Sequence, residues 1–554
     1  MQGKINSQNK YDRRKAMKKK NYDTLGVMLD MSRNAVMSMD ALKKYLVYLR
    51  KMGYNCVMLY TEDTYEVTGE PYLGYMRGRY SCEDLRELDA YAAELGIELI
   101  PCIQTLAHLQ GFVPWKQVPI DNEDAMLVGD PRVYEFIENL IRSLRTCFKT
   151  NRIHIGMDEA WTLGRGQYMN LHGYESPVAI MEKHLAQVCE IVRKYDFQPM
   201  IWSDMFFRSI HPNNKYYQPR REMPEQVKKA VPSDVIPVYW DYYQDNEQAY
   251  DDMLFNHEQI SDKTWFAGGI WTWRGFLPIN DFSILSMRHA IKACQKHGVR
   301  NIFFTMWGDD GAECSRYAAI PSLYYLAEYL RGNEDEEKIK AGFARLFDAD
   351  FDAFMSLDAL NGLIRNHAVK QDATPKLLLF NDYFSGVNDI RVLPDAVPEI
   401  KRIAEMWHGY AKKYRRWGYL FDCAAKLADV LAIKYDLGLR TRAAYRAGDK
   451  DALRALAQND YAVLVRLIDR FALALEKQWN TENKPTGFDV QDIRLGGLIR
   501  RTDSCRRRLL DYAGGKIDSI PELEVELLDG VTPSGAANNY GKMVTANRLT
   551  HKIL

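Results

Sequence analysis

Short apolar segments alternate with amphipathic stretches from about residue 22 to about residue 330. Each apolar segment has the length of a buried strand and ends in polar residues. The stretch after it repeats its apolar positions every three to four residues, as a helix does. About eight such strand–helix units predict an α/β fold, the (β/α)8 TIM barrel, with a doubly wound open sheet as the alternative. The predicted strands are Leu25–Asp30, Asn55–Tyr60, Glu98–Gln104, Arg152–Asp158, Pro199–Asp204, Val235–Tyr242, Trp265–Trp271 and Ile302–Trp307.

The predicted helices carry start and stop signals. Gly53, Gly96 and Gly298 each stand just before a predicted strand, where the end of a helix favours glycine. Ser81 with Asp84 resembles a capping box that uses Asp in place of Glu. No glycine-rich phosphate loop follows the first strand, which weakens the open nucleotide-binding sheet. The helices expected between the strands include Ala41–Met52, Cys82–Leu95, Pro131–Cys147, Pro177–Tyr195 and Ile284–His297.

Strand signals fade after about residue 330, and helical periodicity dominates, as in Ala424–Arg446 and Ala452–Gln478. We therefore predict an N-terminal arm over 1–21, a (β/α)8 barrel over 22–330 and a mainly α-helical C-terminal domain over 331–554. The segment Asp492–Gly497 is rich in glycine and charge for a helical domain, and we interpret it as a packing turn.

Composition narrows the class of protein. The chain has 554 residues, of which 47% are hydrophobic and 27% charged, as in globular proteins. Lys and Arg together equal Asp and Glu together at 74 each, so charge gives no general attraction to nucleic acid or to an anionic membrane. The nine cysteines are scattered, without a CxxC pair, which is typical of reduced thiols in the cytoplasm. The polar, basic first 20 residues hold no signal-like apolar segment, and no apolar run is long enough to cross a bilayer.

Acidic, aromatic, His and Arg residues stand where the predicted strands end, and those ends share one rim of a barrel. Four of the eight carry a Trp near the tip, which chance would not readily produce. Tryptophan rings stack on the apolar C–H faces of sugars, and acids bind their hydroxyls. Any single Trp, taken alone, more often packs in a hydrophobic core than binds a ligand. No His, Cys, Asp and Glu cluster has metal-ligand spacing, so neither metal nor other cofactor is expected. The rim residues include Asp30, Arg33, His108, Trp202, Trp240, Tyr242, Trp271, Trp273, Trp307 and Asp309.

The fourth predicted strand ends in the adjacent acids Asp158 and Glu159. Strand alternation would place His154 and Asp158 on one face, with Glu159 pointing away unless the strand ends there. A pair of acids at such a tip suits acid/base work on a sugar bond. By itself the pair fits a solvated acidic turn equally well. His154 is expected to be a hydrogen-bonded core residue, and His108, just past the third predicted strand, is a candidate for the site.

These residues resemble glycoside hydrolase family 20, the exo-β-N-acetylhexosaminidases. The run from His154 to Glu159 matches the family's His-x-Gly-x-Asp-Glu signature. Leu29–Arg33, Leu106–His108 and Trp307–Asp309 resemble three further blocks, the last with Asp in place of Glu. The likeness covers roughly residues 22–330 and points to a bacterial, cytoplasmic-type branch in which a helical domain follows the barrel.

The resemblance implies substrate-assisted catalysis with retention, through an oxazolinium ion formed by the substrate's own acetamido group. Consecutive acids cannot easily flank a glycosidic bond, and this mechanism removes that difficulty. Glu159 would be the acid/base, and Asp158 would stay ionised and orient the acetamido N–H. The expected substrate is an oligosaccharide or glycoconjugate with a terminal β-linked GlcNAc or GalNAc. Trp202, Trp240, Trp271, Trp273 and Trp307 would wall the sugar, and Arg33, Asp309, His108 and the strand-one Asp30 would serve its hydroxyls.

The chain departs from the family pattern in two places. Only about 22 residues precede the first strand, so the small α/β domain that usually stands before the barrel is not expected. The tyrosine that binds the acetamido oxygen usually lies on strand seven, where this chain has Trp271 and Trp273. We place that role on strand six, at Tyr242 or Tyr243. Tyr242 is preferred because it shares a face with Trp240.

Three alternatives stay open from the sequence. One is a double-displacement retaining glycosidase on sugars without an acetamido group, with Asp204, Glu62 or Asp309 as nucleophile. Another is a non-catalytic sugar-binding barrel, against which the intact acid pair argues. The helical region could also serve as a dimerisation module, which leaves a homodimer open alongside the enzyme.

Overall fold

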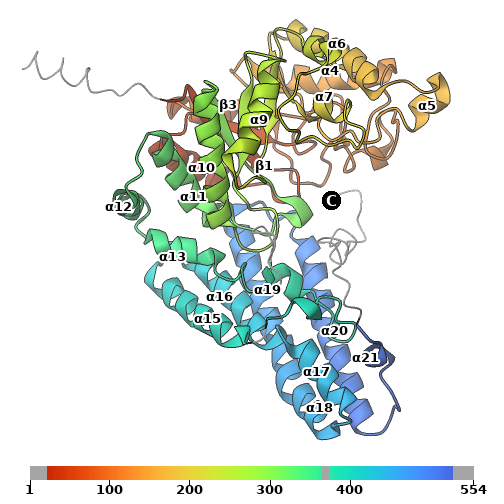
Figure 1. Ribbon diagram of the computed structural model, residues 1–554, viewed down its shortest axis with the longest axis vertical. Helices are drawn as coiled ribbons and strands as arrows, with labels where there is room; N and C mark the ends of the chain where they lie inside the picture. Colours follow the sequence, from red (N-terminus) through yellow and green to blue (C-terminus); the bar gives the residue numbers. More distant parts are fainter. Residues whose placement is uncertain (1–20, 365–373, 394, 528–554) are drawn as a thin grey trace, which may run out of the picture.

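The computed structural model describes residues 21–364, 374–393 and 395–527. Eight parallel strands close into a barrel in chain order, with β1 paired to both β2 and β8. The barrel and the later helices form two separate parts of the molecule (Figure 1). Closure confirms the predicted TIM barrel and rules out the open sheet. The strands are β1 (Thr24–Asp30), β2 (Cys56–Tyr60), β3 (Glu98–Cys102), β4 (Arg152–His154), β5 (Gln198–Trp202), β6 (Ile236–Trp240), β7 (Trp265–Gly269) and β8 (Asn301–Met306).

Helices surround the barrel, and their caps explain where they begin and end. The Ser38 side chain accepts a hydrogen bond from the backbone of Ala41, so α2 begins at Met39, two residues before the prediction. The Ser81–Asp84 capping box is confirmed. Gly53 ends α2 in the left-handed conformation, at φ 98°. The helices of this part are α2 (Met39–Met52), α3 (Cys82–Glu94), α4 (Pro131–Arg145), α5 (Gln167–His172), α6 (Pro177–Lys194), α7 (Asp204–Arg208), α8 (Glu225–Ala230), α9 (Glu247–Glu258), α10 (Asn280–Lys296) and α11 (Ile320–Leu330).

Several strands end earlier than predicted, and β4 differs most. It stops at His154, because Gly156 and Met157 adopt φ values of 73° and 68°, which a strand cannot accommodate. The predicted alternation out to Asp158 is therefore wrong. The two acids stand on a bend beyond the strand.

After residue 330 the described residues form helices joined by loops. The helical periodicity predicted over Ala424–Arg446 is confirmed, and two helices share it, α16 and α17, with residues 435 and 436 between them. The packing turn predicted at Asp492–Gly497 is wrong. Its glycines lie inside α20, with nothing within 4 Å of where their Cβ atoms would be. The helices are α12 (Glu336–Phe347), α13 (Phe351–Met355), α14 (Thr374–Leu379), α15 (Ala396–Lys413), α16 (Gly418–Lys434), α17 (Leu437–Arg446), α18 (Lys450–Leu456), α19 (Ala462–Glu482), α20 (Asp489–Ala513) and α21 (Pro521–Glu524).

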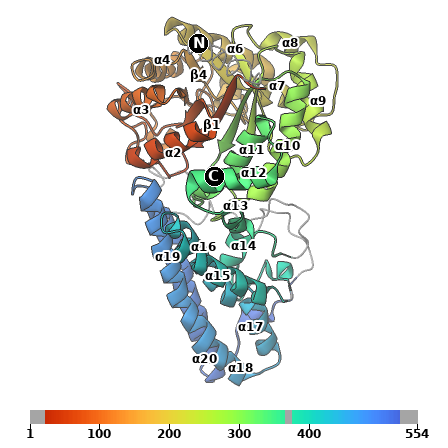
Figure 2. The same ribbon diagram turned by 90° about the vertical axis from the view of Figure 1, so that its left-hand side faces the viewer.

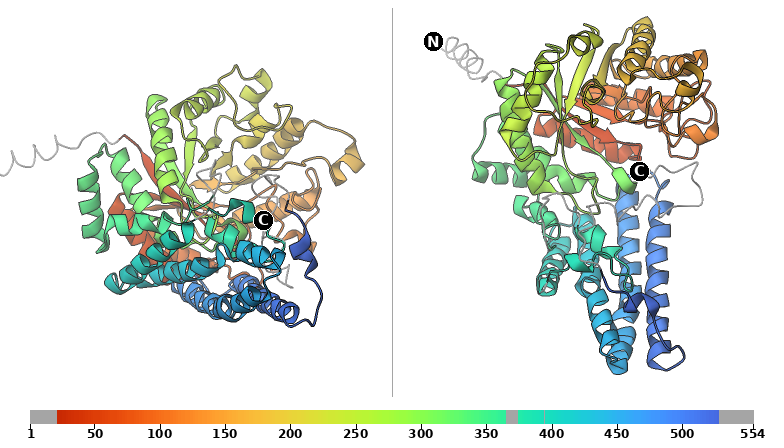
Figure 3. Two further views of the ribbon diagram at one scale, coloured as in Figure 1. Left: turned by 60° about the horizontal axis from the view of Figure 1, so that its bottom comes forward. Right: turned by 45° about the vertical axis from the view of Figure 1, so that its right-hand side comes forward.

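The helical region projects from one end of the barrel, with the long helices α19 and α20 side by side (Figures 2 and 3). The end of α19 meets the loops that follow β1 and β8. The backbone N–H of Ser38 donates to the carbonyl of Glu482 at 3.0 Å, and Arg316 donates to Asn483 Oδ1 at 3.2 Å. These contacts join the helical region to the rim of the barrel.

A buried ion cluster strengthens the same junction. Glu313, in the loop after β8, binds Lys376 of α14 at 2.7 Å and Arg494 of α20 at 2.9 Å. All three side chains are almost fully buried. Removal of the Glu313 carboxylate would take from both cations an anion that they share in a low-dielectric interior, which is costly.

Two sets of predictions reach beyond the described residues. Nearly all of the predicted arm over 1–21 lies outside them, as does the end of the predicted C-terminal domain after residue 527. Within the described ranges, the structure contains no helix with the length and apolar character needed to span a membrane.

Candidate active site

A pocket opens where the parallel strands finish at their carboxyl ends. It encloses about 580 Å³ of space, part of which is open to solvent. Active sites of TIM barrels lie at this face, so the pocket is the candidate active site. All the predicted site residues except Asp30 and Trp271 line it. The lining is Arg33, Tyr60, His108, Asp158, Glu159, Trp202, Trp240, Tyr242, Tyr243, Trp273, Trp307 and Asp309.

The bend after β4 turns both acids toward this pocket. Gly156, Met157 and Glu159 all have positive φ values. A Cβ at Gly156 would lie 2.1 Å from Gln104 Oε1 and 2.7 Å from the carbonyl of Ile103, so only glycine fits. Left-handed backbone at the two non-glycine positions costs of order 1–3 kcal/mol each. The fold maintains this strain where two consecutive carboxyl groups must face one space.

His154 supports the bend from beneath. Its ring is fully buried, and its Nδ1 accepts a hydrogen bond from the backbone N–H of Gly156 at 3.1 Å. Burial lowers the pKa of His154 to about 3, so the ring is neutral. The prediction of a hydrogen-bonded core histidine is confirmed.

Asp158 is held as an anion. Gln104 donates to its Oδ1 at 2.7 Å, and His108 Nε2 lies 3.2 Å from its Oδ2. Burial alone would raise the pKa of Asp158, but His108 and Gln104 outweigh burial and hold that pKa well below its usual range. The same Gln104 accepts from the backbone N–H of Met157 at 3.1 Å, so one side chain fixes both the bend and the carboxylate.

The pKa of Glu159 is shifted in the opposite direction to that of Asp158. Burial raises the pKa of Glu159 to about 7; the charges of Asp158 and Asp204 add to the rise, while His108 and Arg208 oppose it. Its backbone N–H donates to Asp204 Oδ2 at 3.1 Å, and Arg208 Nη2 lies 3.7 Å from its Oε1. Its side chain is about one-third exposed, which leaves it accessible. Two adjacent acids with pKa values driven apart are the mark of divided acid/base roles.

Aromatic rings form a wall of the same pocket. Trp307 Nε1 donates to the Tyr242 hydroxyl oxygen at 3.1 Å, and Trp240 stacks on the Tyr242 ring at 5.5 Å between centroids. Burial raises the pKa of Tyr242 well above its ordinary value, so the hydroxyl keeps its proton. Because its oxygen accepts from Trp307, that proton is left to donate into the pocket.

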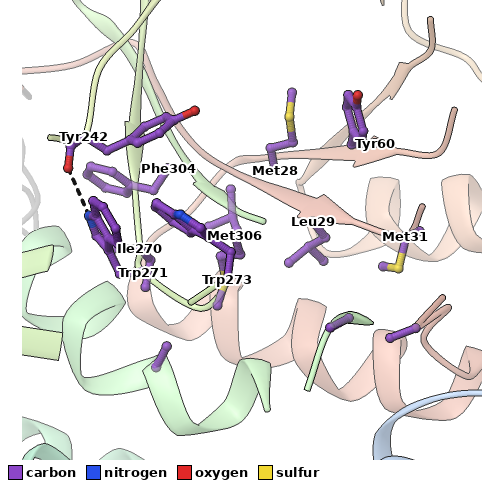
Figure 4. Close-up of a cluster of buried hydrophobic side chains, with 14 of the residues drawn as sticks. Met28, Leu29, Met31, Tyr60, Tyr242, Ile270, Trp271, Trp273, Phe304 and Met306 are labelled. Carbon is purple, nitrogen blue, oxygen red and sulfur yellow. Dashed lines mark hydrogen bonds between the residues drawn. The ribbon is translucent and has the colours of Figure 1, made fainter. Parts of the chain in front are cut away.

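Trp271 lies behind this wall and not in the pocket, contrary to prediction. Its ring is 2% exposed and stacks on Trp273 at 4.3 Å. Figure 4 shows its indole nitrogen directed at the backbone carbonyl of Tyr242, a hydrogen bond of 2.9 Å. The antiparallel bridge of Trp271 to Ile279 turns the chain after β7. Of the two tryptophans, only Trp273 lines the pocket.

The β1 side of the pocket is built around Arg33. Its Nη1 lies 3.3 Å from Asp30 and 3.4 Å from Glu62, and its guanidinium stands 5.5 Å from the Trp307 ring. Burial would lower the pKa of Arg33, but Glu62 and Asp30 keep it above the ordinary value. Asp30 is a correction to the predicted set: it lies behind the pocket, where it accepts from the backbone N–H groups of Ser32 and Gly308.

The predicted set missed four residues that shape the site: Tyr60, Gln104, Asp204 and Arg208. Asp204 accepts a hydrogen bond from the Glu159 backbone and so supports the acid. Tyr60 and Gln104 end predicted strands, so strand ends were a usable signal. Asp204 was considered only as an alternative nucleophile. Arg208 reaches Glu159 only through the turn of α7, which no linear pattern reveals. Among the described residues, no group of three or more His, Cys, Asp or Glu side chains could hold a metal.

Comparison with known proteins places these features in context. Residues 22–264 match the family model of the glycosyl hydrolase family 20 catalytic domain. Residues 352–541 match the model of the Glycoside Hydrolase 20C C-terminal domain. The resemblance seen in the motifs thus extends over both halves of the chain.

Curated relatives are distant in sequence. Hexosaminidase D of Homo sapiens is 26% identical over 240 residues, 40% of this chain and 45% of that protein. A beta-hexosaminidase of Akkermansia muciniphila is 23% identical over 254 residues, 38% of this chain and 51% of that protein. The chain spans about half the length of these relatives. Among solved structures, the GH20 exo beta-N-acetylglucosaminidase from Vibrio harveyi is 17% identical at a TM-score of 0.45, covering 61% of this chain and 59% of that one.

Proposed function

The chain belongs to glycoside hydrolase family 20, and from this premise we propose that it is a retaining exo-β-N-acetylhexosaminidase. One observation carries the proposal: an ionised Asp158 and a protonatable Glu159 face the same aromatic-walled pocket. The substrate would be an oligosaccharide or glycoconjugate that ends in β-linked GlcNAc or GalNAc. The cytoplasmic location predicted from the cysteines remains a proposal beside it.

In the first step Glu159 gives its proton to the glycosidic oxygen. The bond from the anomeric carbon to that oxygen breaks, and the acetamido carbonyl oxygen of the same sugar forms a new bond to the anomeric carbon. Asp158 accepts the acetamido N–H and balances the positive charge of the oxazolinium ion. The low pKa of Asp158 keeps it anionic for this task, and the pKa of Glu159 near 7 keeps a proton available at neutral pH.

Tyr242 would direct the acetamido group. Its hydroxyl accepts from Trp307 and so offers its proton to the acetamido oxygen, which holds that oxygen against the anomeric carbon. Arg33 and Asp309 would bind hydroxyls on the far side of the sugar. In the second step the Glu159 carboxylate takes a proton from water, and the water oxygen attacks the anomeric carbon. The bond from that carbon to the acetamido oxygen breaks, which regenerates the acetamide and restores the original configuration.

The double-displacement alternative finds less support in the geometry. Asp204 is fully buried and already accepts from Arg208 and Glu159, and Glu62 is buried against Arg33 and Tyr60. Neither lines the pocket. Asp309 does line the pocket, on the same side as Arg33. A non-catalytic sugar-binding barrel would have no use for an acid whose pKa is near neutrality.

The acetamido nucleophile is the feature to test. Aryl β-GlcNAc substrates whose acetyl group carries zero, one, two or three fluorines form a graded series, because fluorine weakens the carbonyl oxygen as a nucleophile. We expect kcat/KM to fall steeply along the series and a thiazoline analogue of GlcNAc to inhibit strongly. A flat series, or equal rates on β-glucosides, would establish the double-displacement alternative instead.

A further inference from the structure

Trp161 is a large aromatic side chain left in solvent beside the catalytic acid. It stands two residues after Glu159, and its backbone N–H donates to the Glu159 carbonyl at 2.6 Å. Its side chain is 51% exposed, although most tryptophans of this chain are buried. Exposed indoles next to a polar site are typical of surfaces that bind a ligand. The mechanism proposed above gives Trp161 no role.

A buried arginine supports one face of the indole. The guanidinium carbon of Arg208 lies 3.9 Å from the centre of the Trp161 ring. Arg208 is itself fixed, since its Nε donates to Asp204 at 2.9 Å and its Nη1 to the carbonyl of Asn214 at 3.1 Å. Because one face is covered by this fixed group, the exposure of the ring belongs largely to its other face. The ring is therefore held as a platform before any ligand arrives.

The same arginine places the platform relative to the chemistry. Arg208 Nη2 lies 3.7 Å from Glu159 Oε1, so the same guanidinium contacts the indole and lies next to the carboxyl group of the acid. The pocket that would take the terminal sugar is lined as far as Glu159 and Trp240, and Trp161 is not part of that lining. Glu159 must reach the oxygen that joins the terminal sugar to the next unit. That next unit consequently lies on the solvent side of Glu159, where Trp161 is.

We propose that Trp161, supported by Arg208, forms the subsite for the first sugar of the leaving group. The inference rests on the proposed hexosaminidase function and adds a preference to it. The leaving group would be a pyranose that stacks its apolar C–H face on the indole, and not a small or purely polar group. Cleavage of saccharides would then depend on Trp161 more than cleavage of substrates with a minimal leaving group.

The chain offers a matched control at Tyr174. This tyrosine is 67% exposed and carries the guanidinium of Arg165 4.9 Å from its ring, so it repeats the aromatic–arginine stack on the same long segment after β4. Within the described part of the chain, Tyr174 makes no hydrogen bond, ion pair or ring contact with a residue that lines the pocket. Tyr174→Ala removes an exposed ring of similar kind without touching the proposed subsite.

The experiment compares two leaving groups in the full chain. One substrate is GlcNAc β-fluoride, whose leaving atom cannot reach Trp161. The other is whichever of the β-1,3-, β-1,4- and β-1,6-linked GlcNAc disaccharides the wild type cleaves best. For Trp161→Ala we expect kcat/KM on the disaccharide to fall about tenfold, the size of one lost aromatic stack. The value on the fluoride should stay within about twofold, and Trp161→Phe should recover part of the loss.

The outcomes separate the two proposals. An equal fall on both substrates would mean that Trp161 only positions the Glu159 loop, and no fall on either would mean that no platform exists; both overturn the subsite. An effect of Tyr174→Ala as large as that of Trp161→Ala would overturn it as well. If the wild type hydrolyses no GlcNAc substrate at all, the proposed function fails and the subsite falls with it.

Discussion

The two sides of the pocket are held in different ways. The carboxyl side, with His108, Asp158 and Glu159, takes all its described supports from the barrel: Gln104 after β3, and Asp204 and Arg208 in α7. The arginine side, with Arg33 and Asp309, stands on the loops after β1 and β8. Those loops are tied to the helical region through Ser38, Arg316 and the buried Glu313 cluster.

This difference separates two tasks. Proton transfer requires a particular pair of pKa values, which burial and near neighbours set within a few ångströms. Recognition of sugar hydroxyls requires a fixed shape across a wide rim, and loops at a rim need support from outside the barrel. We therefore expect changes on the carboxyl side to alter the chemical step, and changes at the helical junction to alter binding and stability.

Replacement of the acid should give the largest effect. Glu159→Gln should lower kcat on a β-GlcNAc substrate with a poor leaving group by about 10²–10⁴-fold, the usual contribution of general acid catalysis. A dinitrophenyl glycoside needs no proton to depart, so its rate of glycosidic cleavage, read from the burst of released phenol, should fall far less. Near-native rates on both substrates would show that Glu159 is not the acid.

Loss of the junction carboxylate should rank next. Glu313→Ala leaves Lys376 and Arg494 buried without their shared anion, which should lower the free energy of unfolding by about 3–5 kcal/mol. Denaturant unfolding measures this. The folded fraction should show a raised KM while its pH profile is unchanged, because the carboxyl side is not touched.

The matched control for that change lies on α20, the helix that carries Arg494. Asp503 of α20 pairs with Arg506 and Arg507 near the surface, so Asp503→Ala should change stability by less than about 1 kcal/mol. If Glu313→Ala and Asp503→Ala lower the free energy of unfolding equally, the buried cluster does not stabilise the junction more than a surface ion pair does.

Removal of one hydroxyl should have an intermediate effect. Tyr242→Phe keeps the ring that packs on Trp240 but deletes the proposed donor to the acetamido oxygen, which should reduce kcat about 10²-fold. Tyr243→Phe, next in the chain and half-exposed, should cost only a few-fold. If Tyr243→Phe is the more harmful change, the acetamido donor is Tyr243.

The smallest expected effect is a displacement of the pH profile. Glu159 must be protonated to act, so kcat/KM should decline as pH rises through about 7. The charge of Asp204 raises the pKa of Glu159, so Asp204→Asn lowers that pKa and moves the decline to lower pH. Glu313→Ala should leave the decline in place. A shift with Glu313→Ala and none with Asp204→Asn would contradict the division between the two sides.

Local patterns were enough for the barrel and for most of the pocket. Strand length, strand-end polarity and helix caps depend on neighbouring residues, so the eight strands and the cap at Ser81 could be predicted. Residues such as Trp202, Trp240 and Trp307 were found because parallel strands bring their ends to one rim. Asp30 and Trp271 satisfied the same pattern yet lie behind the pocket, since a strand end gives position along the barrel but not the depth of a side chain.

The sequence by itself determined that two adjacent acids, a set of tryptophans and an arginine would meet at one rim, because those facts follow from period and order along the chain. Only the tertiary structure decided how the acids differ. The bend over Gly156 turned both toward one pocket, Gln104 and His108 stabilised one charge, and burial with the charge of Asp204 raised the pKa of the other acid. A pKa depends on burial and on charges within a few ångströms, and those neighbours come from segments far apart in the chain.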